Sequence, residues 1–162
     1  MPAYRLETLL EIRARAEEAA KQAFSDATRA LVKEQAEQKR LEEDLEKRKR
    51  ERKAKVLAYI QEVMAKGVGA GGLASMNRFE ERLKDEEAQV ALDIEKQKVV
   101  VAEAAKLVEV RRQEMAVAAR DKKAIEKHKE KWVKQIKNER DAREEMNQEE
   151  IGNALFLARQ KR

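Results

Sequence analysis

The stretch Lys66–Ser75, KGVGAGGLAS, carries four of the five glycines of this chain. A P-loop needs a lysine after its glycines, and a dinucleotide-binding loop needs a strand before them. Here Lys66 precedes the glycines, and a helical pattern leads into them. The stretch therefore predicts a hairpin tip, whose glycines cap a helix and adopt positive φ angles, rather than a phosphate site.

Both flanks of this tip are nearly free of helix-breaking residues, with one proline in the whole chain. We expect a first helix over about residues 4–65, a tip over 66–74 and a second helix over about 75–158, with Ser75 as N-cap. The predicted fold class is all-α. It is one long two-helix antiparallel coiled-coil hairpin over residues 1–162, treated as a single domain, with a longer second helix.

Disorder is the rival interpretation, because 43% of the residues are charged and only 4% are aromatic. The heptad spacing of the apolar residues distinguishes a coiled coil from a disordered chain. In the second helix, six of twelve a positions and eight of eleven d positions are apolar, which predicts a left-handed coiled coil. The a positions are Leu73, Glu80, Glu87, Ile94, Val101, Val108, Met115, Lys122, Lys129, Ile136, Arg143 and Glu150, and the d positions are Met76, Leu83, Val90, Gln97, Ala104, Arg111, Ala118, Ile125, Trp132, Glu139 and Met146.

The first helix follows the same spacing with extra steps of four, which predict stutters in the supercoil. Its expected inner residues are Leu6, Leu9, Ala16, Ala20, Ala23, Ala27, Leu31, Leu41, Leu45, Val56, Ile60 and Val63. A reversal near residue 70 would place Leu9 opposite Trp132. Residues beyond about 137 then have no partner, which leaves an apolar overhang containing Met146, Ile151, Leu155, Phe156 and Leu157.

Catalysis finds no support in the sequence. There is no cysteine and a single histidine, and the carboxylates lie in helical rows beside lysines, without a pocket to shift their pKa values. We expect no enzyme activity, no cofactor and no metal site. No run approaches the ~18 apolar residues of a membrane span, and the N-terminus lacks the pattern of a signal peptide. The expected location is the cytoplasm, without direct membrane insertion.

Two further features have competing interpretations. Trp132, with His128 one turn before it, is either part of a binding face or a core residue that closes the open end of the hairpin beside Leu9 and Ile136. We favour the core role, with His128 solvated. The basic run at residues 47–55, KRKRERKAK, resembles a nucleic-acid patch. A solvated helix surface is favoured, because acidic residues precede the run and no aromatic residue interrupts it, so no nucleic-acid partner is expected.

The two ends of the chain resemble a known family. Residues 4–23, YRLETLLEIRARAEEAAKQA, are similar to the opening of the FliJ and YscO (SctO) proteins of type III secretion systems. Residues 125–152, IEKHKEKWVKQIKNERDAREEMNQEEIG, resemble the YscO branch in their His-Lys-x-x-Trp motif and in the acidic run that leads to a glycine. The similarity covers nearly the whole chain.

The resemblance implies a central stalk of the export apparatus, peripheral to the inner membrane. Its partners would be the hexameric secretion ATPase and the cytoplasmic domain of an export-gate membrane protein, with secretion chaperones and a needle-length regulator as further partners. The ATPase would contact Tyr4, Arg5, Leu9, Arg13, Lys131, Trp132, Lys134 and Gln135. The gate would contact Tyr59, Glu62, Met64, Met76 and Arg78.

The alternative function is that of an escort protein, which binds free secretion chaperones through its coiled coil and the overhang. A nucleic-acid-binding coiled coil is the third class.

Overall fold

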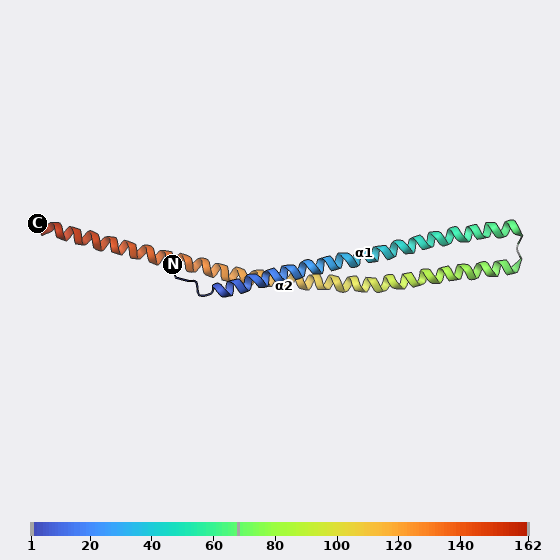
Figure 1. Cartoon of the computed structure of the whole chain (residues 1–162), viewed down its shortest axis with the longest axis horizontal. Helices are drawn as coiled ribbons and strands as arrows, with labels where there is room; N and C mark the ends of the chain where they lie inside the picture. Colours follow the sequence, from blue (N-terminus) through green and yellow to red (C-terminus); the bar gives the residue numbers. More distant parts are fainter. Residues whose placement is uncertain (1, 68, 162) are drawn as a thin grey trace. The chain divides into compact units, whose positions relative to one another are not determined.

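The structure, a computed structural model, describes residues 2–67 and 69–161. It consists of two helices, α1 from Glu7 to Lys66 and α2 from Ala70 to Gln160 (Figure 1). The helices pack against each other in opposite directions, and α2 is the longer, with 91 residues against 60. This confirms the predicted all-α hairpin with a longer second helix. Met1, Arg162 and Val68 of the predicted tip lie outside the described residues.

The contacts divide the chain into two units, and each unit contains part of both helices. The terminal unit comprises residues 1–22 and 113–162, and the tip unit comprises residues 23–112. Each unit has its own contacts between α1 and α2. The single domain over residues 1–162 stays a prediction.

Burial along α2 confirms the predicted heptad register except at Leu73, which is 53% exposed. Every predicted a and d residue from Met76 to Ile136 is buried or half-buried, whereas those from Glu139 onward are exposed. Val90 and Ile94 are the most buried apolar residues of α2, at 9% and 5% exposure. No side chain in the described part of the chain is fully buried. The core is therefore one thin seam between two helices, and many half-buried contacts share its stabilisation.

The inner face of α1 agrees with its predicted residues except at one position. Ala16 is exposed, and the prediction that it faces α2 is wrong. The half-buried position in this turn belongs to Glu17, whose carboxylate lies 2.9 Å from Lys122 Nζ. An alanine methyl group gains little by burial, so a long side chain that can reach an opposite charge occupies the inner position instead.

The tip is shorter than predicted. Gly67 directly follows α1 and has a φ of 66°, the left-handed conformation expected of a glycine at a helix C-terminus. The Gly69 carbonyl already accepts the Gly72 N–H at 3.0 Å, so α2 begins at Ala70. Ser75 is therefore inside the helix, and its assignment as N-cap is wrong. Among the described glycines, Gly67 is the one with a positive φ angle, and Gly71 and Gly72 lie inside α2.

The short tip also shifts which residues meet. The Trp132 ring contacts Tyr4, at 5.2 Å between ring centroids, and the pairing of Trp132 with Leu9 stays a prediction. The numbers of Tyr4 and Trp132 add up to 136, as do those of Glu7 and Lys129, which form an ion pair. This sum is lower than the 141 of the predicted pairing of Leu9 with Trp132, whereas Arg52 and Glu87 in the tip unit add up to 139.

Replacing Gly67 by alanine is expected to destabilise the protein by about 1 kcal/mol, because a Cβ atom disfavours positive φ angles. The matched change Gly71→Ala should instead stabilise by about 0.5–1 kcal/mol. Gly71 lies in the first turn of α2, and an added Cβ atom there meets no atom within 4 Å. Urea unfolding followed by circular dichroism checks both signs. Equal effects of the two variants would contradict the assigned turn.

Candidate partner-binding site

Three rings close the terminal unit at the start of α1. The Tyr4 ring lies 5.2 Å from Trp132 and 5.8 Å from His128, and its hydroxyl oxygen is 2.6 Å from His128 Nδ1, within hydrogen-bonding distance. Tyr4 is 9% exposed. Trp132 is half-buried, as its predicted core role requires. His128 is exposed as predicted, but its hydrogen bond makes it part of the closure.

Ion pairs between α1 and α2 support this closure. Lys129 Nζ lies 2.6 Å from Glu7 Oε2 and 5.9 Å from the centre of the Tyr4 ring. About two turns further into the unit, Arg13 Nη1 donates to Asp121 Oδ2 at 3.1 Å. The N-terminal segment is thus held by both ring packing and charge, and both act across the same pair of helices.

The Glu17–Lys122 pair predicts a sensitivity to acid. The hydrogen bond from Lys122 lowers the pKa of Glu17 below its ordinary value of 4.5, and Lys21 adds to this. A carboxylate with a depressed pKa stabilises the folded state fully above about pH 4.5, and this contribution is lost as the pH falls through the folded-state pKa. On acidification from pH 6 to pH 3, the stability advantage of the wild type over Glu17→Gln should therefore shrink. Urea unfolding at several pH values measures it.

Glu18→Gln is the matched control, because Glu18 is exposed on the same turn. Its stability should follow the wild type through the titration. A constant difference between wild type and Glu17→Gln from pH 6 to pH 3 would contradict the assigned role of the pair.

The residues predicted to contact the ATPase fall into two groups. Tyr4, Leu9, Arg13 and Trp132 are buried, half-buried or paired within the unit. Arg5, Lys131, Lys134 and Gln135 are exposed, and Gln135 donates to Glu139 at 3.0 Å. The first group builds the end of the hairpin, and the second is free to meet a partner.

Lys131 and Lys134 belong to a longer lysine row that the sequence analysis missed. The lysine row comprises Lys123, Lys127, Lys131, Lys134 and Lys137. All five are exposed, and within the described residues none forms an ion pair. Like charges three or four residues apart repel on a helix by roughly 0.2–0.5 kcal/mol per pair. The spacing of the lysines in the sequence would have revealed this row. Covering it with an acidic surface is favourable, because this relieves the repulsion between the lysines.

The tip unit carries a second set of exposed side chains. The Tyr59 and Phe79 rings stack at 6.3 Å, and Arg82 Cζ lies 5.4 Å from the Phe79 ring. Beyond this stack, Met64 is 78% exposed. Of the other residues predicted to contact the gate, Met76 is half-buried, whereas Arg78 and Glu62 are exposed, with Glu62 paired to Lys66 at 2.7 Å.

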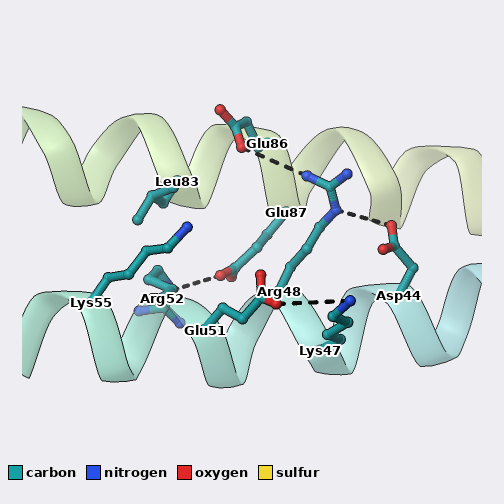
Figure 2. A pocket seen from close by; sticks show the side chains of 9 residues that line it. All are labelled: Asp44, Lys47, Arg48, Glu51, Arg52, Lys55, Leu83, Glu86 and Glu87. Carbon is teal, nitrogen blue, oxygen red and sulfur yellow. Dashed lines mark hydrogen bonds and ion pairs between the residues drawn. The ribbon is translucent and has the colours of Figure 1, made fainter.

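The basic run at residues 47–55 lies within a network of ion pairs (Figure 2). Arg52 Nε donates to Glu87 Oε1 at 2.7 Å, and Arg52 Nη1 lies 3.5 Å from Glu80 Oε1. Arg48 reaches Asp44 on its own helix and Glu86 on α2. These carboxylates compensate part of the positive charge, so the run offers less free charge than the lysine row.

The overhang predicted after residue 137 is exposed over its described residues except at Asp141, which is half-buried. Met146, Ile151, Leu155, Phe156 and Leu157 have exposed fractions between 56% and 62%. In Figure 1 this part of α2, drawn in red, has no segment of α1 beside it. The described residues hold no group of three potential metal ligands, and no helix among them is long and apolar enough to cross a membrane.

Comparison with known proteins identifies the family. A model of the YscO-like protein family matches residues 1–162. The chain belongs to the YscO-like family. A solved structure described as that of a YscO homolog, CT670 from Chlamydia trachomatis, has a TM-score of 0.79 to this YscO-like chain. At 23% sequence identity it covers 100% of this chain and 99% of its own. No curated protein matches the sequence.

Membership makes this YscO-like chain a type III secretion-related protein. The family is one of structural and secretion components rather than of enzymes. The similarity to the solved structure extends over both helices, so the hairpin fold is shared.

Proposed function

We propose that this YscO-like protein is a central stalk of the type III secretion export apparatus. It contacts the hexameric secretion ATPase and the export gate, and it couples ATP turnover to protein export. The observation that carries the proposal is the lysine row, five exposed lysines without an ion pair among the described residues, on the unit that contains both chain termini. Family membership supports the secretion context.

The chemistry of the lysine row suits a ring whose subunits change state in turn. Exposed ion pairs are worth about 1 kcal/mol or less each, so they form and break easily. The contact between Tyr4 and Trp132 holds the helix that carries the row in place. The row can therefore exchange one acidic surface for the next without a single tight binding site. Arg5 adds a cation at the start of the chain.

The tip unit is the proposed contact for the cytoplasmic domain of the export-gate membrane protein. Met64 offers an exposed, flexible apolar side chain there, and the Tyr59–Phe79 stack stiffens the helices behind it. The protein then acts in the cytoplasm, peripheral to the inner membrane. A needle-length regulator is a further candidate partner.

The test is stimulation of the cognate ATPase by purified protein. Reversing Lys127, Lys131 and Lys134 to glutamate should weaken ATPase binding about 10- to 100-fold, since three favourable contacts become repulsive. The control variant reverses Lys33, Arg50 and Lys53, which are exposed in the tip unit and carry the same total charge. Equal loss in both variants, or no loss in the first, would reject the lysine row as the contact.

A second candidate function, escort of free secretion chaperones, is favoured by the exposed overhang. Its apolar side chains suit a helix that docks into a groove of a chaperone. Deleting residues 145–162 should abolish chaperone binding and leave ATPase stimulation intact. If the deletion leaves chaperone binding unchanged, the overhang is not the escort surface.

A further inference from the structure

The tip unit carries an apolar stripe on α2 that faces away from the core seam. The stripe comprises Leu92, Val99, Val100, Leu107 and Val110, with exposed fractions between 41% and 58%. The core residues of the same segment, among them Val90, Ile94 and Val101, are buried or half-buried. At 100° per residue, the stripe and the seam lie on roughly opposite sides of the helix.

Two charged residues lie in the middle of the apolar stripe. Glu103 and Lys106 are both exposed, and within the described residues neither forms an ion pair. They are three residues apart on one helix, a spacing at which such pairs can form. Their charges are therefore available to a molecule that covers the stripe.

We propose that the apolar stripe is a docking surface for a second copy of this chain, with the two α2 helices antiparallel. The stripe is self-complementary when residues whose numbers add up to 209 face each other. Val99 then meets Val110 of the second copy, and Glu103 meets Lys106. A two-fold axis makes each of these contacts twice, as an isologous interface requires.

The flank of the stripe fits the same arrangement. Val100 and Leu107 lie on one side of it, and a two-fold axis across the interface keeps them on a common side in both copies. Their positions along the paired helices then differ by only about 3 Å, so Val100 packs against Leu107 of the second copy. The central apolar contacts, the flanking apolar contacts and the charged contacts therefore all favour the same antiparallel register of the two α2 helices.

The interface is short. From Leu92 to Val110 the helix extends roughly 27 Å, so two such faces bury an area near the lower limit for specific complexes. A reversible dimer with a dissociation constant of roughly 1–100 µM is expected. The surface shares no residue with the lysine row or with Met64, so the inference goes beyond the proposed function and does not depend on it.

Sedimentation velocity over a concentration series of the full chain tests the dimer. The wild type should shift from monomer to dimer as its concentration rises. Glu103→Lys and Lys106→Glu should each abolish the shift, because both place like charges opposite each other. The exchange variant Glu103→Lys/Lys106→Glu should restore it, and Lys33→Glu should leave it unchanged.

The register has its own test, since the chain has no cysteine. Mixing Val99→Cys with Val110→Cys under oxidation should give a cross-linked pair. Val99→Cys alone should not, because its two copies would lie about 16 Å apart along the helices. The proposal is overturned if the wild type stays monomeric. This holds even if another protein is found to bind the stripe. An exchange variant as monomeric as the single variants also overturns it.

Discussion

Replacing Arg52 by leucine is expected to lower the free energy of unfolding by about 2–3 kcal/mol. The Arg52 side chain is 18% exposed and Glu87 is 10% exposed, and they meet at 2.7 Å across the seam of the tip unit. The substitution leaves the Glu87 carboxylate shielded from water without its cation. Breaking one partner of such a pair costs far more than the pair itself contributes.

The double variant Arg52→Leu/Glu87→Leu should therefore recover most or all of the loss, since it replaces the pair by apolar contact. Urea unfolding followed by helical circular dichroism measures each variant. Arg50→Leu is the control, because Arg50 is exposed two residues away, and it should change stability by less than about 0.5 kcal/mol. A double variant as unstable as the sum of the two single variants would contradict this account.

Replacing Trp132 by alanine is the second large change, with an expected loss of about 2–3 kcal/mol. The half-buried indole is the surface on which Tyr4 packs, and Tyr4 in turn holds the residues before α1. Without the indole, the N-terminal segment should open. Trypsin should then cleave after Arg5 faster, while cleavage in the tip unit stays unchanged.

Two further variants separate the contributions at this end. Tyr4→Phe keeps the ring packing and loses only the hydrogen bond to His128, so it should cost about 1 kcal/mol. Val133→Ala is the control beside Trp132, because Val133 is 37% exposed and lies outside the ring cluster. Slow cleavage after Arg5 in Trp132→Ala would show that the rings do not anchor the segment.

Much of the hairpin could be predicted because it depends on local patterns. Heptad spacing predicted the inner face of α2, and the unequal flanks of the glycines predicted the longer second helix. The inner face follows from helix periodicity, and the longer second helix follows from the position of the glycines. Ser75 failed as an N-cap because a good capping residue is only a preference, and α2 had already begun five residues earlier, at Ala70.

The pairing of residues between α1 and α2 was harder to predict from the sequence, because it depends on the length of the tip. Trp132 contacts Tyr4, whose number is five lower than that of the predicted partner Leu9. The numbers of Arg52 and Glu87 add up to 139, so no single register predicts both pairs. The lysine row, in contrast, lies on one helix and could have been found from its spacing.

The central claim is that one chain occupies the middle of one ATPase ring, and stoichiometry tests it most directly. The cognate ATPase, assembled with excess purified protein, can be weighed by mass photometry and native mass spectrometry. The account predicts one chain for every six ATPase subunits, with the ratio lost in the Lys127, Lys131 and Lys134 reversal. A saturated complex with one chain on every ATPase subunit, or no complex at all, would contradict it.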